Sequence, residues 1–354
     1  MRIIREIGAT GIRLAHYQHN DYFYRLCDRN LPLVWAELAL VDFVRATPEA
    51  RDIVRQQLTE LIRQNFNHPW IVTWSLFNEI SSKNQDGPGL IVIDLQQLAK
   101  AEDPDRTTTA TECKDGIENL PKLVPVVNLL ALNAYPGWYF GKAEDMGEVI
   151  DQWNAAFGPK GIMISEYGAG ASIRQHQQDF TGRAVGRTPR DWHPEEYQAL
   201  VHAKAYAAIQ ARPAVFGSFV GNMFDFAAAN RNEGDTPGIN GKGLVTRDHK
   251  VRKDAYFFYQ ANWAAEPMVY ITSRRDVNRT EPVTPVKVYS NCDKVELNVN
   301  GKDYGSARDS APHVLVWNGV SLQDGESRIE VEGTSHGHTV QDRCQWIYHP
   351  KPAN

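Results

Sequence analysis

The segment TPEARDIVRQQLTELIRQNFNHPWIVTWSLFNE, residues 47–79, carries a helical pattern that runs directly into a strand pattern. Thr47 fits the N-cap position of the helix, and Pro48 fits its first turn. The apolar residues of the helical part recur at helical spacing: Val54, Leu58, Leu61, Ile62 and Phe66. Residues 71–77 form an apolar, strand-like run, which is typical of a strand covered on both faces. The segment therefore predicts a helix packed on a parallel sheet.

The same alternation of strand and helix continues to about residue 262. Strands are expected at residues 11–17, 32–38, 71–78, 107–112, 129–135, 161–167 and 215–224. Their starts recur at about 30 residues, the interval of a (β/α)8 barrel. Seven strands are found, and about ten residues precede the first. The sequence therefore predicts an α/β fold, a (β/α)8 TIM barrel that lacks its first strand, and we expect the chain to begin inside the barrel.

The pattern changes after the last helical segment, RKDAYFFYQANW. From about Met268 onward, short runs alternate apolar and polar residues, as in VKVYS, KVELNV, HVLVW and RIEVEG. Asn300 and Gly301 stand between two such runs and predict a two-residue hairpin turn. We therefore expect a barrel domain over residues 1–265 and a small antiparallel, immunoglobulin-like β-sandwich over residues 266–354.

The composition narrows the class of protein. Hydrophobic residues make up 42% of the 354 residues and charged residues 23%, an ordinary balance for a globular domain. A net charge of -5 argues against a protein that binds nucleic acid or a membrane surface. The four cysteines form no CxxC pair, and free thiols are expected, with a Cys292–Cys344 pair in the C-terminal part left open. No signal peptide or membrane-spanning run is found, so localisation stays unknown, and a periplasmic or secreted parent protein is left open.

Polar residues stand at the ends of several expected strands, where the chemistry of a parallel barrel gathers. They are His16, Glu37, Glu79, Asn133, Tyr135 and Glu166. Glu79 and Glu166 are 87 positions apart, which is close to three barrel units. Their side chains should therefore face each other across the mouth of the barrel. Two opposed carboxylates are what glycoside hydrolysis requires, one as acid and one as nucleophile or base.

Four stretches carry a family resemblance: RLAHYQHNDYFYRLCDRN from Arg13, HPWIVTWSLFNE from His68, NAYPGWYFG from Asn133 and ISEYGAGASIRQH from Ile164. They resemble the catalytic barrel of glycoside hydrolase family 2, which includes β-galactosidases, β-glucuronidases and β-mannosidases. The segment from Met223 to Trp263, followed by the sandwich, is most similar to bacterial β-galactosidases. The resemblance covers nearly the whole chain, and members normally carry two further sandwich domains before the barrel.

The resemblance implies a retaining mechanism with Glu79 as general acid/base and Glu166 as nucleophile. It also implies that Asn78 holds the 2-hydroxyl of the sugar and that Tyr135 hydrogen-bonds Glu166. The same resemblance assigns His16 to a sugar hydroxyl and Asn133 to the lining of the pocket. A carbohydrate is therefore the expected substrate, with no nucleic-acid or membrane partner, and homo-oligomer formation is left open.

Asn240 and Lys242, in GINGKGLV, repeat an Asn-x-Lys pattern that β-glucuronidases use on the sugar carboxylate. Galactosidase-like members have closely similar segments, so the pattern alone does not decide the sugar.

Gly221 stands where the family usually has a tryptophan that forms part of the sugar pocket. No cofactor is expected. No metal site is expected either, because AELALVD lacks the histidine of the Glu-x-His pair that some members use for magnesium.

Three functions stay open from the sequence. The first is a retaining exo-β-galactosidase, which the resemblance favours. The second is a β-glucuronidase or another β-glycosidase of the same family, which differs only in the sugar accepted. The third is an inactive remnant that binds carbohydrate or nothing, because Gly221 offers no stacking face and the first barrel strand is expected to be absent.

Overall fold

The structure is a computed structural model that describes residues 1–42, 44, 47–80, 88–113, 126–157, 161–178, 192–307 and 309–350. The chain divides into two compact units. The first unit comprises residue 1 with residues 9–168 and 204–222. The second unit comprises residues 2–8, 169–203 and 223–354.

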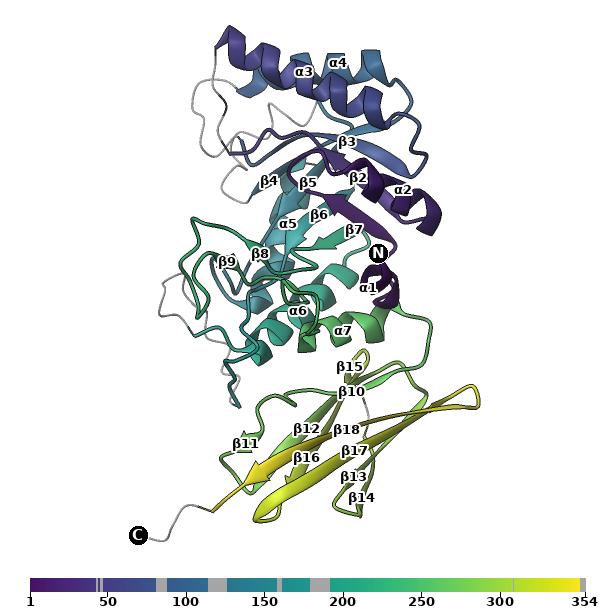
Figure 1. The fold of residues 1–354 in the computed structure, drawn as a ribbon, viewed down its shortest axis with the longest axis vertical. Coiled ribbons are helices and arrows are strands. Elements are labelled where there is room, and N and C mark those ends of the chain that lie inside the picture. The colour runs from purple at the N-terminus through teal and green to yellow at the C-terminus, as the bar shows by residue number, and fades with distance from the viewer. Residues whose placement is uncertain are drawn as a thin grey trace. The chain divides into compact units, whose positions relative to one another are not determined.

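The first unit is built on seven parallel strands (Figure 1). They are β1 (Gly11–Leu14), β2 (Leu33–Glu37), β3 (Ile71–Asn78), β4 (Thr107–Cys113), β5 (Leu129–Asn133), β6 (Ile162–Tyr167) and β7 (Val215–Val220), hydrogen-bonded in sequence order. The edge strands β1 and β7 come close, because a Cβ on Gly11 would lie 3.5 Å from the Phe219 ring. The sheet is therefore a nearly closed barrel of seven strands, and the predicted fold class is confirmed.

Helices alternate with these strands. They are α2 (Asp21–Asn30), α3 (Pro48–Asn65), α4 (Pro88–Glu102), η2 (Ala143–Asp145), α5 (Met146–Phe157) and α6 (Glu195–Gln210), the last of which passes from the second unit into the first. Thr47 caps α3 as predicted, since its Oγ1 accepts from the Ala50 N–H at 3.2 Å. The predicted apolar stripe of α3 is buried at Val54, Leu58, Leu61 and Ile62, whereas Phe66 is exposed at the C-cap.

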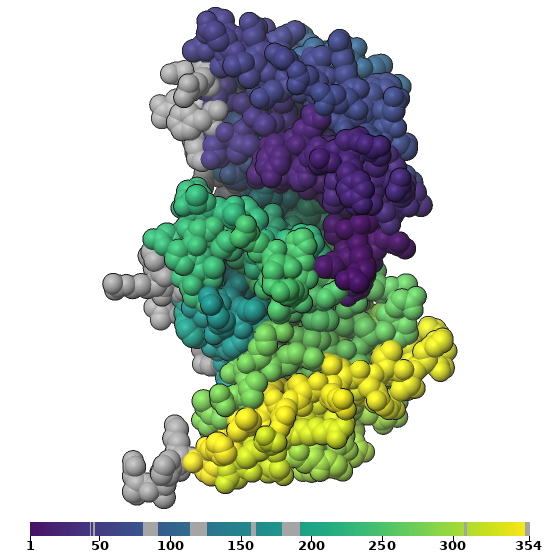
Figure 2. Space-filling model, in the orientation of Figure 1, coloured from purple at the N-terminus to yellow at the C-terminus, as the bar shows by residue number. Residues whose placement is uncertain are grey.

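The second unit contains α1 (Arg2–Glu6), the short strands β8 (Phe226–Ala227) and β9 (Ile239–Asn240), α7 (Asp254–Trp263) and a β-sandwich. One sheet has the order β10-β12-β16-β15 and the other β11-β18-β17-β13-β14. Their bounds are β10 (Val269–Ile271), β11 (Asn278–Arg279), β12 (Val283–Ser290), β13 (Lys294–Val299), β14 (Lys302–Ser306), β15 (Asp309–Ala311), β16 (Val314–Ser321), β17 (Gly325–Ser335) and β18 (His338–Tyr348). Figure 2 shows the β17–β18 hairpin as a yellow surface band.

The predicted hairpin turn between β13 and β14 is confirmed. Val299 pairs with Lys302, and the two residues between them, Asn300 and Gly301, have φ values of 52° and 84°. Both φ values lie in the left-handed region. A two-residue turn needs this conformation if its twist is to match that of the two hairpin strands. Val295, Leu297 and Val299 are buried in the sandwich core, so the predicted alternation of β13 also holds.

All four cysteines, Cys27, Cys113, Cys292 and Cys344, are free thiols, as expected. Among the described residues, no helix is long and apolar enough to cross a membrane.

Candidate active site

Parallel strands end at the same rim of a barrel, and the polar residues predicted for the site gather there. The first unit brings together six of them: His16 after β1, Asn78 and Glu79 at the end of β3, Asn133 and Tyr135 at the end of β5, and Glu166 near the end of β6. Hydrogen bonds between side chains connect all six to Arg13, Glu37 or one another. The rim therefore holds one continuous polar network.

Glu166 has both carboxylate oxygens fixed by hydrogen-bond donors. Arg13 Nη1 donates to Oε1 at 2.6 Å, and Tyr135 Oη donates to Oε2 at 2.7 Å. Burial, followed by the charge of Glu166, raises the pKa of Tyr135 well above its ordinary value, so the phenol stays a donor. The Glu166 side chain is still 16% exposed. A carboxylate that is oriented in this way, beside a cation and open to solvent, suits a nucleophile.

Arg13 is the cation of this network, and the strand-end pattern misses it because it lies inside β1. Its guanidinium, 4% exposed, bonds the fully buried Glu37 through Nε and Nη2 at 2.9 and 3.0 Å. Nη2 also donates to Asn78 Oδ1 at 2.9 Å. Burial acts to lower the pKa of Arg13, but the charges of Glu37 and Glu166 outweigh it and raise that pKa. Arg13 could have been suspected because it is a charged residue within the short strand sequence GIRL. A buried arginine needs an acidic partner, so its presence there indicates a nearby carboxylate.

Arg13→Met should destabilise the protein and shift its pH profile. It would leave the Glu37 carboxylate buried without its main cation, a loss of about 3–5 kcal/mol in the free energy of unfolding. It would also remove the positive charge beside Glu166, so the acidic limb of kcat/KM should move to higher pH. Urea unfolding and a pH–rate profile measure the two effects.

The double variant Arg13→Met/Glu37→Leu is the control for this prediction. Removing both charges should recover much of the stability, because no buried charge is left alone. It should not recover activity, since Glu166 still lacks its cation. Equal stability of Arg13→Met and the wild-type protein would contradict the assignment of Arg13 as the central cation.

Glu79 leaves the line of β3 at a sharp angle. Its φ is 53°, in the left-handed region that residues other than glycine rarely adopt. The conformation costs on the order of 1–2 kcal/mol and is held by a bond from the Glu79 N–H to Thr111 O at 2.8 Å. The carboxylate Oε1 accepts from Asn133 Nδ2 at 2.7 Å. Strain of this kind is concentrated at functional sites.

Asn133 is engaged inside the network. Its Nδ2 donates to Asn78 Oδ1 at 3.1 Å as well as to Glu79, and its Oδ1 accepts from Ser165 Oγ at 2.8 Å. Both amide hydrogens are therefore used, so Asn133 orients Glu79 in this structure, and its contact with a sugar stays a prediction. Asn78 Oδ1 accepts from both Arg13 and Asn133, which leaves the NH2 end of Asn78 to donate to a ligand.

His16 lies close to both Glu37 and Glu166 and is partly exposed to solvent. Its Nδ1 is 2.9 Å from Glu37 Oε1, its Nε2 is 3.7 Å from Glu166 Oε1, and its side chain is 39% exposed. Burial acts to lower the pKa of His16. The hydrogen bond to Glu37 and the charges of Glu166 and Glu37 outweigh both burial and the charge of Arg13, so the pKa is raised. A partly exposed imidazolium suits the predicted contact with a sugar hydroxyl.

Substrate binding should weaken as the pH rises through the raised pKa of His16, because the imidazolium is charged below that pKa and neutral above it. KM should therefore rise on the alkaline side of the ordinary histidine value of about 6.5. His16→Gln, which does not titrate, should have a high KM that does not change with pH in this range. An alkaline rise of the same size in His16→Gln would assign the effect to another group.

Gly221, directly after β7, borders the Glu166–Tyr135 pair. A Cβ at Gly221 would lie 2.4 Å from Tyr135 Oη and 3.6 Å from Glu166 Cβ. Tyr135 is 5% exposed and packs on Tyr139 with ring centroids 5.0 Å apart. Any side chain at position 221 therefore requires Tyr135 to move. As expected of a glycine, this position offers a sugar no stacking face.

Asn240 is the last residue of β9, Lys242 lies in the turn that follows this strand, and both belong to the second unit. Asn240 Oδ1 accepts from the Lys242 N–H at 3.1 Å, and both residues are buried. The Asn240 side chain therefore shapes the turn that carries Lys242. Their contact with a substrate stays a prediction.

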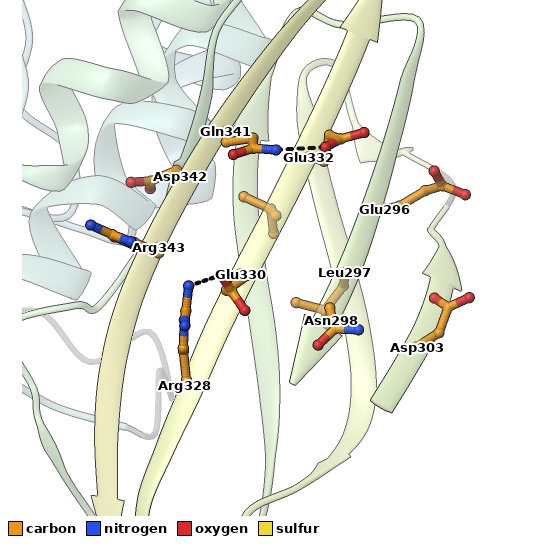
Figure 3. Close-up of a pocket in the computed structure, with 11 residues that line it drawn as sticks. Glu296, Leu297, Asn298, Asp303, Arg328, Glu330, Glu332, Gln341, Asp342 and Arg343 are labelled. Atoms are coloured by element: carbon orange, nitrogen blue, oxygen red, sulfur yellow. Dashed lines mark hydrogen bonds and ion pairs between the residues drawn. The ribbon is translucent and has the colours of Figure 1, made fainter. Parts of the chain in front are cut away.

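A pocket of about 720 Å³ lies on the five-stranded sheet of the sandwich (Figure 3). Four of its polar side chains form two pairs: Arg328 Nη2 donates to Glu330 Oε1 at 2.5 Å, and Gln341 Nε2 donates to Glu332 Oε2 at 2.7 Å. None of the described residues that line it is aromatic or belongs to the predicted site. In the described part of the chain, no group of three or more His, Cys, Asp or Glu side chains could hold a metal ion.

Comparison with known families gives two matches along the chain. The family described as "Glycosyl hydrolases family 2, TIM barrel domain" matches residues 1–266. A domain of unknown function matches residues 281–341, within the sandwich.

Comparison with individual proteins gives relatives with two names. A "Beta-glucuronidase" of Bacteroides fragilis is 42% identical over 338 residues, which cover 93% of this chain and 47% of that protein. The structure of an "FMN-binding beta-glucuronidase" from Facaelibacterium prausnitzii L2-6 is 37% identical with a TM-score of 0.89, covering 99% of this chain and 53% of the other. A "putative beta-galactosidase" structure from Bacteroides fragilis is 34% identical with a TM-score of 0.88, covering 98% of this chain and 51% of the other. The chain thus spans about half the length of these relatives.

Proposed function

Because the chain belongs to glycosyl hydrolase family 2, we propose that it hydrolyses terminal β-linked glucuronic acid from β-glucuronides with retention of configuration. The observation that carries the mechanism is the hydrogen-bonded network of the rim. It fixes Glu166 with Arg13 and Tyr135, and it fixes Glu79 with Asn133. One carboxylate is held beside a cation and the other beside a neutral amide. This difference suits a nucleophile and a general acid.

The reaction has two displacements. In the first, a Glu166 oxygen attacks the anomeric carbon while Glu79 gives its proton to the glycosidic oxygen, so the alcohol leaves and a glycosyl ester forms. In the second, Glu79 takes a proton from water, which attacks the anomeric carbon and releases Glu166. Arg13 and Tyr135 keep the Glu166 carboxylate oriented throughout. The NH2 end of Asn78 would donate to the 2-hydroxyl as the oxocarbenium-like charge develops.

Glucuronide is proposed as the sugar for two reasons. The two most similar relatives reported above carry the name β-glucuronidase, which supports this alternative over the galactoside that the sequence first suggests. The Asn240–Lys242 turn also supplies a lysine for the substrate carboxylate, a charge-assisted contact that a neutral sugar cannot make. The β-galactosidase function remains the second candidate, supported by the third relative.

Hydrolysis of 4-nitrophenyl β-glucuronide and 4-nitrophenyl β-galactoside by the chain tests the proposal. A higher kcat/KM for the glucuronide is expected. Lys242→Met should lower kcat/KM for the glucuronide by about 10- to 100-fold, because a charge-assisted contact contributes about 1.5–3 kcal/mol, and should leave the galactoside rate nearly unchanged. A preference for galactoside would favour the second candidate. Failure to hydrolyse either glycoside would favour the inactive remnant.

A further inference from the structure

The turn that follows Asn240 and carries Lys242 is held by groups from distant parts of the second unit. The Ala171 N–H donates to Gly241 O at 3.0 Å, and the Lys253 N–H donates to Leu244 O at 2.9 Å. The Gly243 N–H donates to Asp225 Oδ1 at 2.8 Å. Hydrogen bonds to three other segments therefore converge on this short turn, two of them between backbone groups and one to the Asp225 carboxylate.

The Lys253 side chain lies at the centre of this arrangement. It is fully buried, and its Nζ donates to Ala171 O at 2.8 Å, to Gly241 O at 2.9 Å and to Asp225 Oδ1 at 2.9 Å. An ammonium group has three N–H donors, and here each one has an acceptor. The three acceptors belong to the segment after β6, the turn itself and the segment after β7, so one side chain fastens all three together.

Close packing constrains the backbone of the turn. A Cβ on Gly243 would lie 2.0 Å from the Asp225 backbone nitrogen, so only glycine allows this close approach. The buried Gln198 amide bridges the turn to the segment after β6, since its Nε2 donates to Ala169 O at 2.9 Å and to Gly243 O at 3.2 Å. The other donors named here are neutral backbone or amide N–H groups. Among these donors of the described residues, the Lys253 ammonium is the charged one.

We propose that Lys253 is a positioning residue for substrate selection: its ammonium fixes the Asn240–Lys242 turn in the conformation that discriminates glucuronides from neutral glycosides. This inference rests on the proposed function, because it assigns the substrate carboxylate to Lys242. Lys253 touches neither substrate nor the acid pair in this role. It acts through Gly241, whose carbonyl it holds between Asn240 and Lys242.

Two variants and one control test this role. Lys253→Met removes the ammonium, and Asp225→Asn/Lys253→Met also removes the carboxylate, so that no unpaired buried charge opposes folding. Lys287→Met is the matched control, because Lys287 is a half-buried lysine of the same unit that lies in the sandwich, on strand β12. Circular dichroism and thermal melting establish that each variant is folded.

The first measurement is hydrogen exchange of the peptide covering residues 238–246 in the protein without substrate. We expect exchange about 10-fold faster in both Lys253 variants, because the turn loses a buried anchor, and no change in the control. The second measurement is the ratio of kcat/KM for 4-nitrophenyl β-glucuronide to that for the β-galactoside. The ratio should fall about 10-fold through a higher KM for the glucuronide, with kcat for the galactoside retained.

The outcomes separate this inference from the function on which it rests. Unchanged exchange in both Lys253 variants overturns the inference, even where Lys242→Met lowers the ratio and so supports the proposed function. Faster exchange with an unchanged ratio also overturns it and leaves Lys253 with a role in folding alone. If Lys242→Met leaves the ratio unchanged, the proposed carboxylate contact fails, and the assignment of Lys253 to substrate selection fails with it.

Discussion

Glu166→Gln should lower kcat/KM for an aryl glycoside by on the order of 10⁵-fold, since removing a nucleophile abolishes the covalent route. The substitution keeps the shape of the side chain but replaces one carboxylate oxygen with an NH2 group. That group would face a donor, either Arg13 Nη1 or Tyr135 Oη, both of which now donate to Glu166. Some loss of stability is therefore expected too, and a melting curve measures it separately from the rate.

Glu148→Gln is a suitable control for that experiment. Glu148 is an exposed residue of α5 in the same unit, and its carboxylate accepts from the Gln152 amide one turn along the helix. The chemical change is the same, but the rate should stay within about two-fold of the wild-type rate, as expected for a surface substitution. A residual rate for Glu166→Gln within about 10-fold of wild type would exclude Glu166 as the nucleophile.

Glu79→Gln should have the second largest effect, and its size should depend on the leaving group. General acid catalysis contributes about 10²- to 10⁴-fold. An alkyl glycoside, whose alcohol must be protonated to leave, should lose that factor. A 2,4-dinitrophenyl glycoside should lose little in its first step, because its phenolate leaves without a proton. The amide oxygen of the substituted side chain can still accept from Asn133 Nδ2, so the fold should be retained.

Azide gives an independent readout for this variant. A small anion needs no general base, so azide should restore the second displacement in Glu79→Gln and yield a β-glycosyl azide. It should not accelerate the wild-type protein. Equal losses for both leaving groups, without rescue by azide, would mean that Glu79 acts only in structure.

Most of the barrel could be predicted from the sequence because its signals are local. The helix α3 shows its cap, its proline and its apolar stripe within 18 residues. The strand β3 has the predicted bounds, Ile71–Asn78. The strands β1 and β7 end earlier than expected, at Leu14 and Val220, because the chain leaves the sheet at the rim to present His16 and Gly221. The apolar runs in the sequence do not show at which residue the chain leaves the sheet.

The positions of Glu79 and Glu166 could also be predicted, because the period of the fold places them at strand ends, and their catalytic roles stay a prediction. Glu79 and Glu166 each stand at the end of a buried strand, and the barrel brings strand ends to one rim. Arg13 could not be found in this way. It bonds Glu166, 153 positions later in the chain, and no local pattern encodes that pairing. The contacts of Asn133 could not be predicted either, since its bonds to Asn78 and Glu79 come from three-dimensional packing.

In the proposed function, the choice between sugars would depend on different residues from those that cleave the bond. A glucuronide and a galactoside would present the same anomeric centre to Glu79 and Glu166, so the proposed acid pair would not distinguish them. They differ in the group at carbon 6 and in the orientation of one hydroxyl. For this reason the catalytic pattern predicts the reaction more firmly than the substrate, and the Lys242 and Lys253 variants address the substrate separately.

Trapping the glycosyl ester tests the central claim most directly. A 2-fluoro sugar slows both displacements, while a fluoride leaving group keeps the first one fast enough to accumulate the ester. The chain would be incubated with the 2-deoxy-2-fluoro-β-glycosyl fluorides of glucuronic acid and galactose, digested, and sequenced by mass spectrometry. We expect one fluoroglycosyl group on the peptide that contains Glu166, attached to that carboxylate. A label on Glu79, or turnover of an unmodified glycoside that gives the inverted anomer as first product, would contradict the account.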